Sequence, residues 1–320
     1  MHHTRVLHAF AKISLPLPTV TKRPWRVPCA VARFERVHTG AKYGYGGENA
    51  LFYEKSRPGY LADALRAIED EIRRIRKDTT DDSHLLVDLG CGTGKFTREI
   101  LPFARSEELS VIGIEPVEAM RKQFEAALPG VQVKDGRGDN IPLLNCSARA
   151  MIAPQSFHWM SSPETLREVH RVLVPGGLFI LVWNTRDGSK SWVRGLEGII
   201  DPCYGTDVPR QHGGTWKRSF QDLEQQSGSG GESARERPRK FFGELVEQHF
   251  EHSVFLNKDE LNRLVRSLSV VAIRPESEQA DASRRIQELI ESHPDTRDKL
   301  QNTGKVELFY DTEVYWCRRL

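Results

Sequence analysis

The chain has 320 residues, of which 38% are hydrophobic, so it can bury the core of one large domain or of two small ones. Its formal net charge of +2 gives no sign of a nucleic-acid footprint, and no apolar stretch is long enough to span a bilayer. The five cysteines are scattered without metal-ligand or disulfide spacing, which favours a reducing compartment.

The N-terminal segment differs from the rest of the chain. Residues 1–34 contain no Asp or Glu, and their Lys and Arg residues are interspersed with Ser and Thr. Residues 5–15 can form a short basic amphipathic helix, which Pro16 and Pro18 would end. This composition is typical of a mitochondrial presequence and also of a disordered basic tail. We assign residues 1–40 to such a tail and 41–320 to one domain, and we expect a cytoplasmic protein, with mitochondria as the alternative.

Past residue 40, strands and helices are predicted to alternate. Hydrophobic periodicity predicts helices over 60–77, over 95–104, around Met120, Phe124 and Leu128, and over 163–173. Short apolar runs predict strands over 85–89, 110–115, 131–134, 149–153 and 178–183. Because strand and helix alternate, the fold class is α/β, with a mostly parallel sheet and helices on both faces.

The C-terminal part is predicted to be less regular. Residues 221–240 include SGSGGESARERPRK, which has no periodicity and indicates a flexible insertion. A sixth strand is expected over 250–256 and a final strand over 306–317. Between them, Asn257 and Glu260 have the spacing of a capping box at the start of a helix.

The stretch LVDLGCGTGK (86–95) joins the first predicted strand to the helix after it. The carboxyl edge of a parallel sheet is where open α/β sheets bind ligands, and glycines let backbone amides approach a ligand closely. Asp88 is a poor neighbour for a pyrophosphate and a good one for an ammonium or a sulfonium. Glu115 ends the second strand, where an acid can accept both hydroxyls of a ribose. The ligand is therefore predicted to be a positively charged nucleoside, and this pattern points to S-adenosylmethionine.

Several segments resemble the class I S-adenosylmethionine-dependent methyltransferases. VDLGCGTGK and VIGIEPVEAM are similar to the first two motifs of that family, and GRGDNIPL (136–143) resembles its adenine loop. FYEKSRPGY (52–60) and QSFHWM (155–160) resemble the branch of small-molecule enzymes that includes trans-aconitate methyltransferase-like proteins. The resemblance implies a Rossmann-like fold whose final strand inserts antiparallel beside the sixth.

The resemblance also implies roles for individual residues. The methionyl part of the cofactor is expected at Asp88, Gly90, Gly92 and Gly94. Glu115 is expected at the ribose, Gly138 and its neighbours around the adenine, and Gln155 between the sulfonium and the acceptor. Three positions depart from the family pattern, namely Arg137, Arg149 and Val270; at the last of these, in the acceptor pocket, the resemblance implies a tyrosine.

Three residues are candidates for catalysis. His158 or Tyr53 could take a proton from a hydroxyl or amine acceptor, whereas Arg57 could orient a carboxylate, which needs no base. Each has an ordinary alternative, because His158 could pack the strand end and Tyr53 and Arg57 could dock the first helix. His249 and His252 favour a solvated strand face over a metal site.

The sequence as a whole therefore predicts an enzyme that methylates a small molecule on oxygen, a carboxylate or nitrogen, without a metal, as a monomer or homodimer. The near-neutral charge argues against a nucleic-acid partner, and no membrane partner is expected. The alternatives are a protein or nucleic-acid methyltransferase and a non-catalytic cofactor-binding subunit. A nicotinamide dehydrogenase is more distant, because the glycines follow G-x-G-x-G and not G-x-G-x-x-G.

Overall fold

The computed structural model describes residues 57–78, 84–204, 208–228 and 240–320, so the expected N-terminal tail and Tyr53 lie outside the described residues. Within these ranges seven strands form one sheet in the order β3-β2-β1-β4-β5-β7-β6. The strands are β1 (Leu85–Leu89), β2 (Ser110–Ile114), β3 (Gln132–Lys134), β4 (Ala148–Pro154), β5 (Leu173–Arg186), β6 (Val246–Leu256) and β7 (Val306–Arg318).

Strands β1 to β5 are parallel, and β7 is antiparallel to both of its neighbours, β5 and β6. The predicted mostly parallel sheet, with an antiparallel last strand beside the sixth, is therefore confirmed. The crossover connections place the carboxyl ends of β1, β2, β4 and β5 at one edge of the sheet, so the turns after these strands come together.

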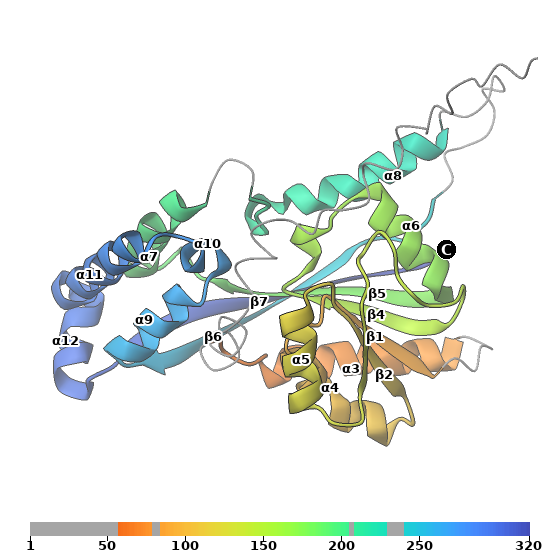
Figure 1. Cartoon of the computed structure of the whole chain (residues 1–320), viewed down its shortest axis with the longest axis horizontal. Helices are drawn as coiled ribbons and strands as arrows, with labels where there is room; N and C mark the ends of the chain where they lie inside the picture. The colour runs from red at the N-terminus through yellow and green to blue at the C-terminus, as the bar shows by residue number, and fades with distance from the viewer. Residues whose placement is uncertain (1–56, 79–83, 205–207, 229–239) are drawn as a thin grey trace, which may run out of the picture. The chain divides into compact units, whose positions relative to one another are not determined.

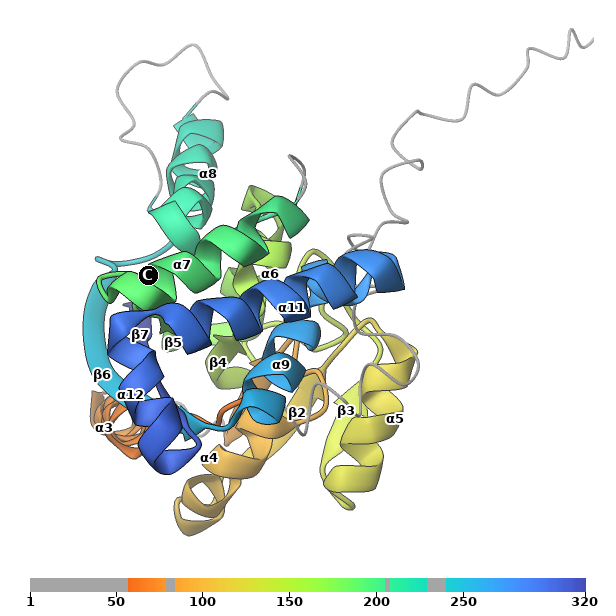
Figure 2. The same ribbon diagram turned by 90° about the vertical axis from the view of Figure 1, so that its left-hand side faces the viewer.

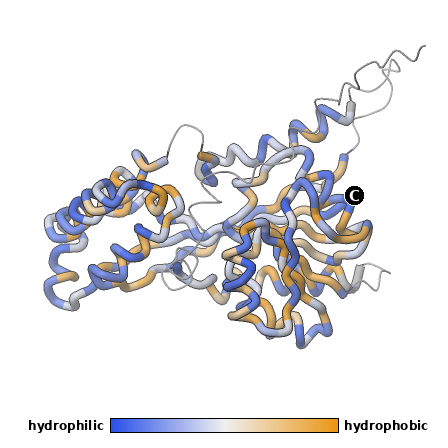
Figure 3. The backbone as a smooth tube through the Cα atoms, in the orientation of Figure 1, coloured by the Kyte–Doolittle hydropathy of each residue, from blue (hydrophilic) through white to orange (hydrophobic). Residues whose placement is uncertain are grey.

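Helices cover both faces of the parallel half (Figure 1). Buried residues of α3 and α4 pack on one face of β1, β4 and β5, and residues of α6 and α8 pack on the other. Hydrophobic residues gather along these strands, whereas the helices alternate between hydrophobic and hydrophilic positions (Figure 3). The helices of this half are α3 (Ala62–Asp78), α4 (Lys95–Ser106), α5 (Glu118–Ala127), α6 (Pro163–Val172) and α8 (Arg218–Gly228).

A second group of helices packs around the far ends of β6 and β7, with α11 lying across α7 and α9 (Figure 2). This group has its own hydrophobic cluster, which includes Val306, Leu308 and Tyr310 from one face of β7. The predicted capping box is confirmed, because Asn257 accepts from the Glu260 amide and Glu260 from the Asn257 amide. The helices are α7 (Ser191–Ile200), α9 (Lys258–Arg266), α10 (Ser269–Ala272), α11 (Glu276–Ser292) and α12 (Pro294–Thr303).

Two expectations from the sequence need correction. Residues 221–228, expected within a flexible insertion, belong to α8 because Leu223 is anchored in the core with 1% of its surface exposed; residues 229–239 lie outside the described residues. Strand β5 begins at Leu173 and not at Leu178, because a bulge accommodates the Pro-Gly-Gly segment that was expected to precede the strand. No helix in the described ranges combines the length and apolar character needed to cross a bilayer.

Candidate active site

The turn between β1 and α4 is built on three glycines with positive φ. Gly90, Gly92 and Gly94 have φ values of 72°, 55° and 84°, a region that side chains with a Cβ rarely adopt. The Gly90 amide donates to the Ile114 carbonyl at 2.7 Å, which ties the start of the turn to β2. Gly94 is the N-cap of α4, so the turn ends where the helix begins.

Only one of the three glycines faces open space. A Cβ on Gly90 would lie 2.6 Å from Ser156 Cβ, and a Cβ on Gly94 would lie 2.6 Å from the Leu128 side chain. A Cβ on Gly92 would meet no described atom within 4 Å. Gly90 and Gly94 are thus required for close packing of the turn, whereas Gly92 is the position where a ligand can approach the backbone.

Asp88 lies beneath this turn as a buried carboxylate with 2% of its surface exposed. Its Oδ2 accepts from Thr97 Oγ1 at 2.5 Å, but its Oδ1 has no hydrogen-bond partner among the described residues. Burial raises the pKa of Asp88 to about 7, because a low-dielectric site disfavours the charged form. A cationic ligand would supply the missing partner, and the buried Oδ1 therefore fits the ammonium or sulfonium expected here.

Glu115 follows β2 directly and reaches back to the glycine turn. Its Oε2 accepts from the Gly92 amide at 3.0 Å and its Oε1 from the Val117 amide at 2.8 Å. A carboxylate has about four acceptor positions, so capacity remains for the two hydroxyls of a ribose. Burial raises its pKa to about 7, although the two amide bonds oppose that rise. The structure thus brings Asp88, Glu115 and Gly92 together at one edge of the sheet.

The loop after β3 is fastened by helix α6. Arg171 donates to both oxygens of Glu168 at 2.7 Å and to the carbonyls of Ile141 and Leu143, and Glu168 accepts the Ile141 amide. A Cβ on Gly138 would lie 2.6 Å from the sulfur of Met160. Gly138 is therefore needed where this loop packs beside the η2 turn (Phe157–Trp159), next to the glycine turn.

A separate cavity lies past the ends of β4 and β5. Its lining includes Arg57, Gln155 and His158, so the structure brings together three of the residues expected near the acceptor. Gln155 has a φ of 53°, a strained conformation for a residue with a side chain. Val270, which departs from the family pattern, also lines the cavity.

The sequence interpretation missed further lining residues. Asn184 to Arg186 end β5 at the expected edge of the sheet, so the rule that located Asp88 could have found them. The others come from an irregular segment without periodicity, which offered no signal: Tyr204, Pro209, Arg210 and Gln211.

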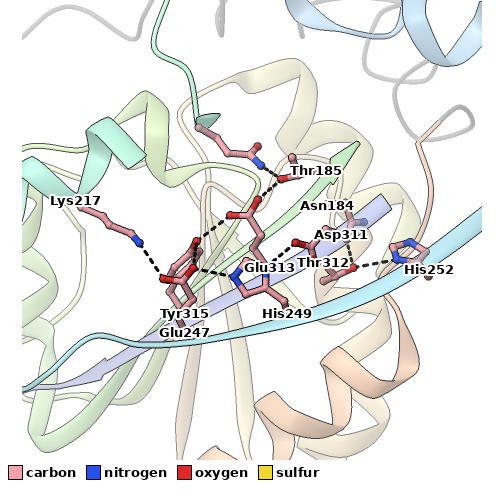
Figure 4. Close-up of polar contacts among 11 residues, drawn as sticks. Asn184, Thr185, Lys217, Glu247, His249, His252, Asp311, Thr312, Glu313 and Tyr315 are labelled. Atoms are coloured by element: carbon pink, nitrogen blue, oxygen red, sulfur yellow. Dashed lines mark hydrogen bonds and ion pairs between the residues drawn. The ribbon is translucent and has the colours of Figure 1, made fainter. Parts of the chain in front are cut away.

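Asn184 connects this cavity to a polar network that runs across β5, β7 and β6 (Figure 4). Thr312 Oγ1 donates to Asn184 Oδ1 at 2.8 Å, which orients the amide so that Nδ2 donates to the Gly59 carbonyl at 2.9 Å. The segment that carries Arg57 is thereby held against β5. A second set of bonds starts at Thr185, which also lines the cavity, and runs through Glu313, Tyr315 and Glu247 to His249. His249 lies between Asp311 and Glu247, at 2.6 and 2.8 Å, and these two carboxylates raise its pKa.

The charges on the cavity wall are positive. Among its described lining residues there are three arginines and no Asp or Glu. Arg186 is paired with Glu197 behind the wall, and Arg210 pairs with Asp201 at 3.2 Å while lying over the Tyr204 ring. Although two of these arginines are already paired, the wall offers cationic hydrogen-bond donors, and such donors favour an electron-rich or anionic ligand.

Comparison with known proteins agrees with this geometry. Residues 87–181 match the family described as the methyltransferase domain. An uncharacterized methyltransferase of Mycobacterium bovis is 30% identical over 265 residues, which is 81% of this chain and 89% of that protein. An uncharacterized methyltransferase-like protein of Schizosaccharomyces pombe is 29% identical over 82% of this chain and 91% of its own length.

A solved structure has the same fold. It is described as a type II methyltransferase from Anaeromyxobacter dehalogenans, and it superposes with a TM-score of 0.50 at 17% identity, covering 82% of this chain and 97% of that one. The sheet order, the glycine turn and the relatives lead to one conclusion: the chain belongs to the class I S-adenosylmethionine-dependent methyltransferases.

Proposed function

We propose that the chain binds S-adenosylmethionine at the β1–β2 edge and methylates a small, anionic acceptor in the cavity past β4 and β5. The observation that carries the proposal is the pairing of two adjoining sites of opposite charge. The buried oxygen of Asp88 suits a cation, and the arginine-lined wall suits an anion. When bound, S-adenosylmethionine supplies a methyl group on a positively charged sulfur.

The cofactor-side residues act by binding and orientation. Gly92 leaves room for the ligand beside the backbone, Glu115 accepts the ribose hydroxyls, and Asp88 faces the positive charge of the methionyl part. Gly138 keeps the adenine loop closely packed, and Gln155, which lines the acceptor cavity at the end of β4, is proposed to border the sulfonium as well. Holding two reactants in line can lower a barrier by about 7–11 kcal/mol, so positioning accounts for much of the rate.

The acceptor is proposed to be small because the described residues leave a cavity of about 80 Å³. That is several times the space of about 10–15 Å³ that one water molecule requires, and it suits a group of a few heavy atoms. A carboxylate fits the wall best, because an arginine can donate to both of its oxygens. Arg57 is proposed to make this contact. A carboxylate also reacts without losing a proton, so neither His158 nor Tyr53 has to act as a base.

The test is a transfer assay with methyl-labelled S-adenosylmethionine and a panel of small carboxylic acids, alcohols and amines. The proposal predicts a labelled product from the acids that releases labelled methanol in alkali, because a methyl ester is hydrolysed there while ethers and methylamines are not. The Gly92→Ala variant serves as the control for transfer that depends on the cofactor site. Label found only in protein or nucleic acid would contradict the proposal and favour a macromolecular acceptor.

A further inference from the structure

The imidazole of His158 makes a contact that determines which of its nitrogens carries the proton. The indole nitrogen of Trp183 donates to His158 Nδ1 at 3.2 Å. An indole N–H can only donate, so Nδ1 must present its lone pair. In a neutral imidazole one nitrogen is a donor and the other an acceptor, and the proton must therefore lie on Nε2.

The surroundings keep this contact in place. Trp183 has no exposed surface, and its ring packs on Trp216 and Tyr315 with centroids 4.9 and 5.9 Å away. The His158 ring lies against Trp159 at 5.1 Å. If the imidazole turned over, a carbon would face the indole N–H, and a buried donor would lose its acceptor. If Nδ1 were protonated, two N–H groups would face each other.

We propose that Trp183 holds His158 as a hydrogen-bond donor to the acceptor, so that His158 binds the substrate and does not remove a proton from it. The ring lines the cavity, and its Nε2 lies on the edge away from Trp183. An N–H at this position can bind a carboxylate oxygen but cannot accept a proton. Trp183 is thus a positioning residue, acting through His158.

This inference rests on the proposed function and deepens it, because it requires an acceptor that already carries its nucleophilic lone pair. Among the described residues, the charged or titratable groups that line the cavity with His158 are Arg57, Arg186, Arg210 and Tyr204. None of them is a carboxylate that could receive a proton from the imidazole. Methyl transfer to a carboxylate forms a C–O bond, breaks the C–S bond and moves no proton, which matches a site built from donors.

The first test needs no substrate. The full chain is labelled with ¹⁵N-histidine, and the His158 signals are identified by their loss in His158→Gln. We expect an unprotonated Nδ1 and a protonated Nε2 from about pH 6 to about pH 9, a range that spans the ordinary titration of histidine. The opposite tautomer, or a ring that becomes doubly protonated near neutral pH, would overturn the inference. This result is independent of whether the protein transfers methyl groups.

Two variants separate the hydrogen bond from the packing. Trp183→Phe keeps an aromatic ring but removes the N–H, so His158 should lose its fixed tautomer and begin to titrate. Trp216→Phe alters the same aromatic cluster without touching the His158 contact and should leave the tautomer unchanged. If Trp183→Phe does not fold, the ¹⁵N-histidine spectrum of the wild-type protein still decides which nitrogen of His158 carries the proton. An unchanged tautomer in a folded Trp183→Phe protein would contradict the inference.

Acetate then probes the donor directly. Titration with sodium acetate should shift the Nε2 signal of His158, and methylammonium chloride at the same concentration should not. Arg57→Met should weaken the acetate response at least tenfold. With an acceptor in hand, His158→Gln, which retains an N–H donor, should keep more activity than His158→Ala at every pH. Acetate without effect on Nε2, or equal loss in both His158 variants, would overturn the inference.

Discussion

The role of the glycine turn in packing can be separated from its role in ligand binding. Three glycine-to-alanine substitutions, each of which adds one methyl group, make this test. Gly92→Ala introduces a Cβ into open space, whereas Gly94→Ala places one 2.6 Å from Leu128 and 2.7 Å from Phe124. Both positions have positive φ, so each variant bears a similar backbone strain. Gly304→Ala is the matched control, because Gly304 also has positive φ and open space but ends α12, far along the chain.

The expected magnitudes follow from these contacts. A left-handed conformation costs an L-residue about 1–2 kcal/mol, and overpacking costs about 1–3 kcal/mol more. Gly92→Ala and Gly304→Ala should therefore lower the free energy of unfolding by about 1–2 kcal/mol, and Gly94→Ala by about 2–5 kcal/mol. For binding the order changes: Gly92→Ala should weaken cofactor affinity at least tenfold, or about 1.4 kcal/mol, whereas Gly304→Ala should not change it.

Urea denaturation gives the unfolding free energies, and calorimetric titration with S-adenosylhomocysteine gives the affinities. We expect Gly92→Ala to behave like Gly304→Ala in the unfolding assay and unlike it in the binding assay. Equal affinity in these two variants would show that the ligand does not lie over Gly92, and the assignment of the cofactor site would have to be abandoned.

Three further predictions concern the two buried carboxylates, the contacts of Arg171 and the hydrogen bond from Thr312 to Asn184. Because burial raises the pKa of Asp88 and Glu115 to about 7, the free protein binds more protons than the unfolded chain between about pH 4 and 7, and its unfolding free energy should fall across that window. Cofactor affinity should rise by up to about tenfold per pH unit for each carboxylate as the pH approaches 7, and it should level off above that pH. Flat calorimetric affinity from about pH 6 to 8 would refute this. Arg171→Met should lower the free energy of unfolding, measured by urea denaturation, by about 1–3 kcal/mol. Arg167→Met breaks only exposed contacts, an ion pair with Glu164 at 3.6 Å and a hydrogen bond to Gln226, and should cost about 0.5 kcal/mol or less; equal losses would contradict the fastening role of Arg171. Thr312→Val should raise the KM for the acceptor about fivefold, for a lost bond of about 1 kcal/mol, and leave cofactor affinity intact. An unchanged KM would show that the Thr312 bond to Asn184 does not support the acceptor cavity.

The parallel half of the fold was predictable because its patterns are local. Each buried strand is a short apolar run, and each covering helix shows its own 3.6-residue period, as in the buried positions of α4. Open α/β sheets bind ligands at the carboxyl edge of the sheet, and this rule located Asp88, the glycines and Glu115 without knowledge of any contact. The finer resemblance to the trans-aconitate branch stays a prediction.

The other features of the fold and the site could not be predicted, because they depend on contacts between segments that are distant in the chain. Helix α11 was missed because its buried positions, Ala282, Ile286 and Ile290, are spaced through a mostly polar and charged sequence. The sequence predicted that Gly90 and Gly94 would contact ligand, but their packing against Ser156 and Leu128 appears only once the chain is folded. The tautomer of His158 likewise depends on Trp183, 25 residues away along the chain.

A crystal structure with S-adenosylhomocysteine would test the central claim most directly, because it shows where the ligand lies relative to the two charged sites. We expect the ribose hydroxyls at Glu115, the amino-acid part over Gly92 and Asp88, and the sulfur toward Gln155 and the arginine-lined cavity. A ligand bound elsewhere, or one whose sulfur points away from that cavity, would contradict the claim that this edge of the sheet transfers a methyl group to an acceptor held there.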